Sequence, residues 1–150
     1  MSGDEVFITV RPAVAPRELA DFYARNHVCS GEDSQERAER VLRHTDLFVV
    51  AWRQGRVAGL VRADFDGIDG HICEFCVDRD CQGASDGRAG ATIAGDSLGV
   101  GRAMGEAALR ELLALGAQRI TVSPRARLEE CFLRSLGFTR RANHRQYRAD

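Results

Sequence analysis

The chain has 150 residues, 44% of them hydrophobic and 29% charged, which is the balance of one soluble globular domain that needs neither disulfides nor metal to build a core. All 21 basic residues are arginine, and the absence of lysine excludes Schiff-base enzymes and phosphate-binding loops of the G-x-x-x-x-G-K-[ST] type. No run reaches the roughly 18 apolar residues of a membrane span, and MSGDEVFITV carries no export signal, so we expect a cytoplasmic protein with no membrane partner.

The charges are unevenly placed along the chain. Residues 1–118 hold 13 arginines against 19 acidic residues, a net charge of −6, whereas residues 119–150 hold 8 arginines against 3 acidic residues, a net charge of +5. A basic C-terminal segment suits an anionic cofactor or RNA, and an ordinary solvated surface explains the same arginines.

Hydrophobic periodicity and turn residues predict the elements of the first half of the chain. We expect a strand at 6–10, helices within 15–27 and at 31–44, and strands at 46–53, 56–65 and 71–77. Gln54 and Gly55 form the expected hairpin turn between the second and third strands.

A long, glycine-dotted loop at 78–98 leads into the second half. A helix is expected from Gly99 to Gly116, which acts as a C-terminal stop. A strand at 119–123, a helix at 127–136 and one or two strands within 137–150 follow. This order predicts a mixed sheet flanked by helices, in a single α/β (α+β) domain that spans 1–150.

Five cysteines, at positions 29, 73, 76, 81 and 131, are expected to be free thiols because the chain carries no export signal. The cluster His71-x-Cys73-x2-Cys76-x4-Cys81 would need its ligands to converge on one zinc ion. On a strand, however, Cys73 and Cys76 would point away from each other, and no second ligand pair follows. We therefore predict no metal site.

Three local patterns follow one another along the chain. Val77-Asp78 ends a strand and precedes Gln82-Gly83, Gly99-Val100-Gly101-Arg102 opens a helix, and Leu136-Gly137-Phe138 ends the last helix. With these patterns in this order, the chain resembles the GNAT superfamily of acyl-CoA-dependent N-acyltransferases over nearly its whole length. The resemblance implies a mixed, mainly antiparallel central sheet of 6–7 strands flanked by about four helices.

The resemblance also implies where an acyl-CoA, most simply acetyl-CoA, would bind. Glycines at a helix start let a pyrophosphate approach the unpaired backbone N–H groups at the positive end of the helix dipole. The implied pyrophosphate-binding residues are Gly99, Val100, Gly101, Arg102 and Ala103, and the backbone of Phe75, Cys76 and Val77 would pair with the pantetheine arm. Ordinary flexibility of a helix start is the alternative interpretation of the glycines.

The region before this helix departs from the family pattern. Asp96 stands three residues before Gly99, where the family has Gln or Arg, and a carboxylate there either repels a diphosphate or caps the helix. Gln82-Gly83 resembles the start of the motif, displaced upstream. Residues at about 83–98 are therefore expected to be an inserted Gly-rich loop, whose Arg88 could fold over the diphosphate or the substrate.

The last helix lacks the residues that the family uses there. Counting back from Gly137, the tyrosine that often protonates the departing thiolate falls on Leu133, and the asparagine falls on Ala126. A thiolate is a tolerable leaving group without a dedicated acid. The substitutes open to the chain are Ser123, Cys131 and Tyr147.

Glu74 is the candidate general base, because it lies on the strand that would hold the acyl group and a carboxylate can accept the proton of an attacking amine. A solvent-facing or Arg-paired strand residue is the alternative, and His71, expected on the other face of the strand, is the rival base. The residues expected near the substrate are Asn26, His27, Glu32, Asp33, Asp64 and Asp66. Their acidic bias suits a cationic amine such as an amino sugar, a polyamine or an amino acid derivative, and surface solvation explains the same acids.

Together these features predict an N-acyltransferase, most simply an N-acetyltransferase, that moves an acyl group from acyl-CoA to a primary amine of a small molecule by direct attack. Two alternatives stay open. The altered loop is compatible with a carrier protein or an aminoacyl-tRNA as acyl donor, docked on the basic C-terminal segment. The missing motif residues are compatible with a GNAT-like binding module without turnover. The oligomeric state, a homodimer included, is also open.

Overall fold

A computed structural model describes residues 5–83, 93, 95–124, 128–140 and 147–149 of the chain. The helices and strands are β1 (Val6–Val10), α1 (Pro16–Arg25), α2 (Gly31–His44), β2 (Leu47–Arg53), β3 (Arg56–Phe65), β4 (Asp69–Val77), the short 3-10 helix η1 (Arg79–Cys81), α3 (Val100–Ala114), β5 (Arg119–Val122), α4 (Leu128–Ser135), β6 (Phe138–Arg140) and β7 (Tyr147–Ala149). The predicted helices and strands are confirmed, with bounds that shift by one or two residues.

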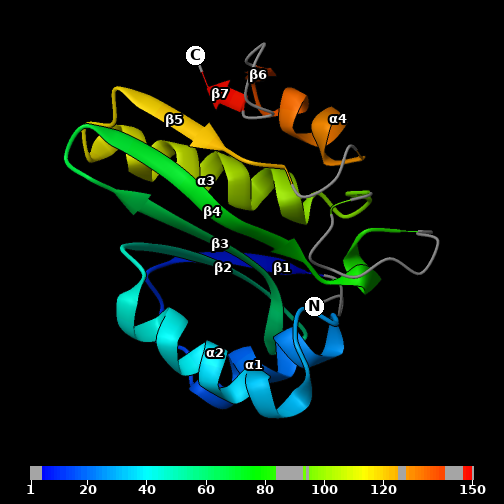
Figure 1. The fold of residues 1–150 in the computed structure, drawn as a ribbon. Coiled ribbons are helices and arrows are strands. Elements are labelled where there is room, and N and C mark those ends of the chain that lie inside the picture. The colour runs from blue at the N-terminus through cyan, green and yellow to red at the C-terminus, as the bar shows by residue number, and fades with distance from the viewer. Residues whose placement is uncertain (1–4, 84–92, 94, 125–127, 141–146, 150) are drawn as a thin grey trace.

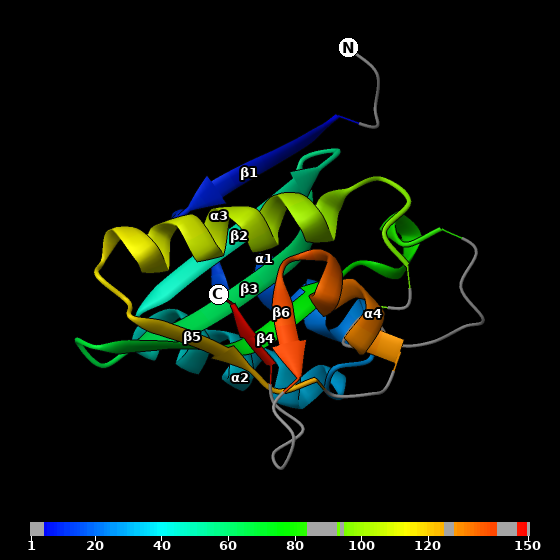
Figure 2. The same cartoon turned by 90° about the horizontal axis from the view of Figure 1, so that it is seen from above.

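The strands form one sheet in the order β1-β2-β3-β4-β5-β7-β6, in which β4 and β5 run parallel and the other described pairs are antiparallel. Helices α1 and α2 cover one face of this sheet, and α3 and α4 lie on the other (Figure 1). Seen from above, α3 lies across β2 and β3, while α4 stands next to β6 (Figure 2). The predicted mixed, mainly antiparallel sheet with flanking helices is thus confirmed.

Side chains that alternate along the central strands fill two separate cores. The α3-side core includes Val49, Phe75 and Met104, and the α1/α2-side core includes Tyr23 and Cys76. Phe75 and Cys76 are neighbours on β4, so their side chains are buried on opposite faces of the sheet. Only their backbone is left for the cofactor contacts that the resemblance implies.

Two predicted stop signals have the backbone geometry that they require. Gln54 and Gly55 have φ angles of 55° and 75°, and two positive φ values are typical of the type I′ turn that joins twisted antiparallel strands. Gly116 has a φ of 100° after the end of α3, and the Ala117 N–H donates to the Leu112 carbonyl at 3.0 Å. This bond pattern closes a helix with a left-handed glycine, as predicted.

A β-bulge interrupts the alternation of side chains along β4. Arg62 of β3 lies opposite Glu74, but the next β3 residue, Ala63, lies opposite Ile72. Cys73 is therefore an extra residue on β4, and the strand shifts by one position at this point.

The bulge brings the two candidate bases to the same face of the sheet. Ile72 and Phe75 both belong to the α3-side core, so His71 before them and Glu74 between them point to the α1/α2 side. On that side the His71 Nδ1 atom lies 2.8 Å from the Thr121 Oγ1 atom of β5. The prediction that His71 and Glu74 lie on opposite faces is therefore wrong, because simple alternation does not allow for the extra residue.

The cysteines are free thiols, as predicted, and Cys76 and Cys81 are buried. Cys73 lies in the bulge and donates its thiol hydrogen to the Arg62 carbonyl at 3.4 Å, whereas Cys76 points into the α1/α2-side core. Among the described residues, no group of three or more His, Cys, Asp or Glu side chains is placed to hold a metal ion.

Candidate functional site

The first part of the candidate site is the place where β4 and β5 separate. The strands pair from Asp69–Ile72 against Arg119–Val122, and in the described part of the chain β4 then continues to Val77 without β5 beside it (Figure 2). A cavity of about 20 Å³ lies in this opening, between β4, the chain that follows β5, and α4. The residues that resemble the pantetheine-binding strand of the family, 75–77, lie on this stretch of β4.

One residue of the predicted insertion occupies this opening. Ile93 is 1% exposed, belongs to the α3-side core and lines the small cavity. Its backbone N–H donates to the buried carboxylate of Glu129 on α4 at 3.2 Å. Ile93 therefore forms part of the wall of the opening and packs against α4. Arg88 and the remainder of 84–92 lie outside the described residues.

The two ends of the predicted insertion lie against each other. A Cβ atom on Gly83 would be 3.0 Å from the Ser97 Cβ atom, and the Gly95 N–H donates to the Gln82 side-chain carbonyl at 3.3 Å. Gln82 is buried, and its amide nitrogen donates to the Val77 carbonyl at 2.8 Å. Gln82 and Gly83 therefore lie beside Gly95 and Ser97, and the Val77 carbonyl already has a protein partner.

The N-terminus of α3 is the second part of the candidate site. Gly99 is the N-cap residue, with a φ of 71° that favours glycine, and open space surrounds the position of its missing Cβ. The Asp96 carboxylate accepts hydrogen bonds from the Gly101 N–H at 2.7 Å and from the Arg102 N–H at 3.0 Å. Asp96 thus caps the helix, as one of its two interpretations predicted, and its own carboxylate occupies two of the N–H groups predicted to bind a pyrophosphate.

The predicted pyrophosphate-binding residues 99–103 are brought together as one helix start, but the Arg102 side chain is turned elsewhere. Its guanidinium contacts the Ser135 carbonyl at 3.3 Å and lies 3.7 Å from the Glu106 carboxylate. Arg102 therefore links α3 to the end of α4 and contributes its backbone N–H to the helix start.

Gly101 has a packing reason to be glycine. A Cβ atom at this position would lie 2.9 Å from the Phe132 ring of α4 and 3.1 Å from the Asp96 carboxylate. Phe132 cannot retreat freely, because its ring packs edge-on against Phe75 with 5.3 Å between the ring centres.

Gly101→Ala is expected to lower the free energy of unfolding by about 1–3 kcal/mol through this overpacking. Without the contact, alanine would stabilise a helix by about 1 kcal/mol relative to glycine. Urea unfolding therefore gives opposite signs for the two cases, and a gain in stability would contradict the close approach of α4.

Glu74 is the centre of a buried charge network. Glu74 as a whole is 2% exposed. Its carboxylate accepts hydrogen bonds from the Tyr23 hydroxyl at 2.7 Å, the Arg62 Nε at 2.8 Å and an Arg37 terminal nitrogen at 2.5 Å. The partners come from α1, β3 and α2, and the Arg37 guanidinium also lies 5.0 Å above the Tyr23 ring. Of the alternatives that the sequence left open, the Arg-paired strand residue is the one observed.

The network fixes the protonation states of its members. Burial alone would raise the pKa of the Glu74 carboxyl, but the charges of Arg37 and Arg62 and the Tyr23 hydrogen bond outweigh it, so that this pKa lies below its ordinary value. Burial, and then the Glu74 charge, raise the pKa of the Tyr23 hydroxyl far above its ordinary value, so Tyr23 is the donor. A carboxylate with a lowered pKa is a weak proton acceptor, and the role of Glu74 as a base stays a prediction.

Tyr23→Phe is expected to lower the free energy of unfolding by about 1.5–3 kcal/mol, because it removes a buried hydrogen bond to a charged group and leaves the ring in place. It should also raise the Glu74 pKa towards its ordinary value. Urea unfolding measured between pH 7 and pH 3 checks both effects, and equal stability of the two proteins at all pH values would exclude the hydroxyl from the network.

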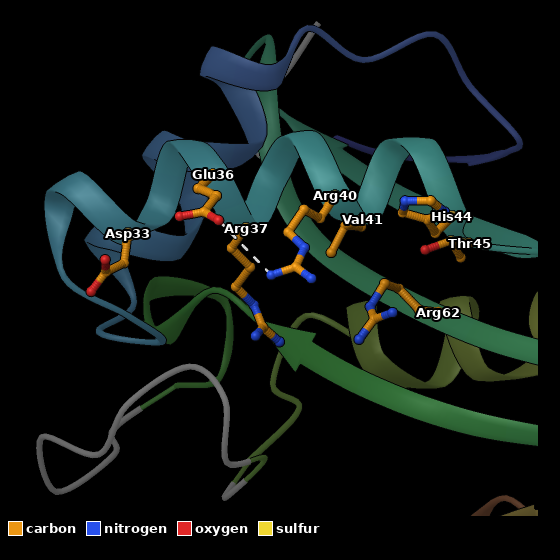
Figure 3. Close-up of a pocket in the computed structure, with 8 residues that line it drawn as sticks. All are labelled: Asp33, Glu36, Arg37, Arg40, Val41, His44, Thr45 and Arg62. Carbon is orange, nitrogen blue, oxygen red and sulfur yellow. Dashed lines mark ion pairs between the residues drawn. The ribbon is translucent and has the colours of Figure 1, made fainter.

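A second, larger cavity of about 470 Å³ lies between α2 and β3 on the α1/α2 side (Figure 3). Arg37, Arg40 and His44 extend from α2, Arg62 extends from β3, and Asp33 and Glu36 lie at the N-terminal end of α2. Arg37 and Arg62, which line this pocket, are the two arginines that bind Glu74. The α2–β3 pocket and the β4–β5 opening therefore adjoin the same residue of β4.

The residues predicted to surround the substrate are mostly elsewhere. Asn26 is buried and joins α1 to η1, since it donates to the Phe22 carbonyl and accepts from the Arg79 N–H, both at 3.0 Å. Asp66 accepts from two backbone N–H groups of the β3–β4 turn. His27, Glu32 and Asp64 are exposed, and Asp33 alone of the predicted set lines the α2–β3 pocket.

Sequence reasoning missed Tyr23 and the pocket arginines. Arg37, Arg40 and His44 recur at intervals of three and four residues, which places them on one helix face, and this spacing was the available signal. Nothing comparable in the sequence connects Arg62 or Tyr23 with Glu74.

The predicted substitutes for a general acid lie in different places. Ser123 lines the β4–β5 opening and Cys131 is exposed on α4. Leu133, in the position of the family's tyrosine, is buried beside the same opening. The Tyr147 side chain and Ala126 are outside the described part of the chain.

No protein-family model matches this chain, and no curated protein matches it in sequence. Its fold has counterparts among solved structures. An acetyltransferase of the GNAT family from Streptococcus pneumoniae TIGR4 has a TM-score of 0.61 at 19% identity, over 90% of this chain and 88% of that one. A structure from meticillin-resistant Staphylococcus aureus, described as a probable acetyltransferase, has a TM-score of 0.67 at 16% identity, over 93% of each chain.

An aminoglycoside 6'-N-acetyltransferase complexed with coenzyme A is also similar, with a TM-score of 0.64 at 13% identity, over 95% of this chain and 93% of that one. These likenesses extend over nearly the full length of the chains. The chain therefore has the fold of the GNAT acetyltransferases, as predicted from its three sequence patterns.

Proposed function

We propose that this protein is an N-acyltransferase that moves an acyl group from acyl-CoA, most simply acetyl-CoA, to a primary amine of a small molecule. The observation that carries the proposal is a glycine-containing helix start, at 99–103, combined with a β4 edge that β5 leaves free, within the GNAT fold. In this arrangement the α3 N–H groups would hold the diphosphate, and the backbone of 75–77 would align the thioester beside Glu74.

The proposed reaction is direct attack of the amine nitrogen on the thioester carbonyl carbon. The C–N bond forms, the C–S bond breaks, and the nitrogen gives up one proton. Glu74 is the proposed proton acceptor, and the leaving thiolate needs no dedicated acid. His71 is the rival acceptor, because the bulge brings it to the same face as Glu74.

Two described contacts must change for acyl-CoA to bind in this way. Asp96 must release the Gly101 and Arg102 N–H groups, and Ile93 must move out of the β4–β5 opening. A GNAT-like binding module without turnover is the second candidate function, because the last helix has Leu133 in the position of the family's tyrosine. The Asp96 and Ile93 contacts favour a donor other than acyl-CoA, such as a carrier protein or an aminoacyl-tRNA.

Calorimetry with acetyl-CoA, combined with a thiol-release assay on a panel of primary amines, tests the proposal. Binding of acetyl-CoA together with amine-dependent thiol release is the expected result. Binding without release would favour the module, and no binding would favour another donor. A steep salt dependence of tRNA binding would then point to an RNA-borne acyl group.

We further propose that 1–150 is one acyltransferase domain with an insertion at about 83–98, and the contact between Gly83 and Ser97 supports this interpretation. None of the helices in the described part of the chain has the length and apolar character to cross a membrane. The cytoplasmic location and the absence of a membrane partner stay predictions, as do a homodimer and an RNA or carrier-protein partner.

A further inference from the structure

We infer that the α2–β3 pocket binds an oxyanion, a carboxylate or a phosphate, carried by the acceptor amine. The inference rests on the proposed function in one respect, namely that the ligand is the acceptor amine. The binding site itself is defined by its own residues. Among the cationic amines suggested by the acidic residues of the sequence, it favours those that also carry an oxyanion, such as amino acid derivatives, over amino sugars and polyamines.

The inner wall of the pocket has an excess of positive charge. Arg37 and Arg62 both bind the single carboxylate of Glu74, whose side chain is fully buried. The two arginine side chains remain 34% and 21% exposed, so they still face the pocket. Two guanidinium groups and one carboxylate leave one net positive charge beside a cavity of about 470 Å³.

The arginines also have hydrogen-bonding capacity that the described residues do not use. Arg62 contacts Glu74 through Nε, and its two terminal nitrogens have no partner in the described part of the chain. The Arg37 Nε and the Thr45 hydroxyl, both from pocket-lining residues, are buried without a hydrogen-bond partner there. A guanidinium presents a planar fork of donors that matches a carboxylate or a phosphate.

The polarity of the pocket gives an acceptor one orientation. Arg40 lies further along α2 and is held only loosely by Glu36, at 3.9 Å between exposed side chains (Figure 3). Asp33, at the outer end, accepts a hydrogen bond from the Ser30 hydroxyl at 2.8 Å. The cationic groups therefore gather near β3 and β4, and the acidic groups lie at the start of α2.

The pocket is also close to the proposed reaction centre. Glu74 lines the β4–β5 opening, and its carboxylate contacts the two arginines that line the α2–β3 pocket. A small acceptor anchored by its oxyanion at Arg62 would thus lie on the same side of β4 as the Glu74 carboxylate. An amino acid-like molecule, with its amine and its oxyanion a few bonds apart, carries both groups that this arrangement calls for.

The test compares matched amines that differ only in the anionic group. Calorimetry on the full chain without acyl-CoA uses propylamine against β-alanine for the carboxylate, and ethanolamine against phosphoethanolamine for the phosphate. The anionic member of at least one pair is expected to bind about 10- to 100-fold more tightly, the worth of a hydrogen-bonded charge pair. The pair with the larger difference identifies the oxyanion.

Three arginine variants make the test specific to the pocket. Arg62→Lys keeps the charge but removes the fork, and Arg40→Gln removes a rim charge outside the Glu74 network; each should reduce the preference for the anionic amine about 5-fold or more. Arg43→Gln is the matched control, because Arg43 is exposed on the same helix and does not line the pocket. It should leave the preference unchanged.

Equal binding of the amines with and without an oxyanion, tighter binding of a polyamine, or equal effects of all three variants would overturn the inference. Because binding is measured without acyl-CoA, the two proposals fail separately. Anion binding without acyl transfer to any amine would refute the acyltransferase and keep the pocket. Acylation of amines that lack an oxyanion, with no preference for those that carry one, would refute the pocket and keep the acyltransferase.

Discussion

Glu74→Gln is expected to lower the free energy of unfolding by about 2–3 kcal/mol at pH 7. The change keeps the shape of the side chain but removes the one negative charge that Arg37 and Arg62 share. Removal of one partner of a buried ion pair costs about 3–5 kcal/mol, and the partial exposure of both arginines reduces that figure. Urea unfolding measures the difference, and Glu32→Gln, an exposed charge loss on α2, is the matched control.

The pH dependence of this difference has a definite sign. The pKa of Glu74 is lower in the folded chain than its ordinary value of 4.5. The carboxylate therefore contributes stability that is fully present above about pH 4.5 and is lost as the pH falls through the folded pKa. Glutamine cannot titrate, so the gap between wild type and Glu74→Gln should narrow below that pH. A gap that stays constant down to pH 3 would contradict the paired carboxylate.

The same variant shows whether Glu74 acts as the proton acceptor of the proposed reaction or only as a structural residue. As the proton acceptor, Glu74 should be worth about 100-fold or more in acylation rate, and the affinity for CoA should not change, because the diphosphate contacts are made at α3. Steady-state kinetics with acetyl-CoA and the best amine give the rate, and calorimetry gives the affinity. An unchanged rate, combined with the stability loss, would leave Glu74 as a structural residue and make His71 the base to test.

The fold could be predicted from the sequence because its signals are local. The helix at 31–44 is acidic at its start and basic at its end, and Gln54-Gly55 is the kind of pair that tight hairpins require. The bulge at Cys73 has no such signal. It depends on how β3 and β4 align, and this alignment is set by packing on both faces of the sheet.

The candidate site was only partly predictable for the same reason. The glycine-rich helix start at 99–103 is contiguous, so the sequence identified it. The partners of Glu74 lie 12, 37 and 51 positions away on three elements, and only the folded chain brings them together. Asp96 was recognisable as a departure from the family motif. The sequence did not show whether its carboxylate would repel a diphosphate or cap the helix, because this depends on where the chain before α3 places the carboxylate.

Asp96→Asn is expected to increase the affinity for CoA by about 10-fold or more. The carboxylate of Asp96 occupies the Gly101 and Arg102 N–H groups, and its charge would repel the diphosphate at close range. Two unit charges about 5 Å apart repel by roughly 3 kcal/mol at an effective dielectric constant near 20, and about 1.4 kcal/mol is already tenfold in binding. Calorimetry with CoA measures the change, and Asp64→Asn, an exposed charge loss on β3, is the matched control.

Asp96→Ala separates charge from capping. Asparagine caps a helix about as well as aspartate, so Asp96→Asn should leave the stability almost unchanged. Alanine frees both N–H groups and should cost about 1 kcal/mol of unfolding free energy. The affinity for CoA is therefore expected to increase from wild type to Asp96→Asn to Asp96→Ala, whereas the stability is expected to decrease in the same order.

Opposite orders for affinity and stability would mean that helix capping and cofactor binding compete for the same two N–H groups. If neither variant gains affinity for CoA, the Asp96 carboxylate does not compete with a diphosphate, and the α3 start is a capped helix and no cofactor site. If the affinity rises and acylation appears or increases, Asp96 limits the occupancy of an otherwise competent site. A rise in affinity without acylation would instead favour the binding module, because access to the cofactor would no longer explain the lack of turnover.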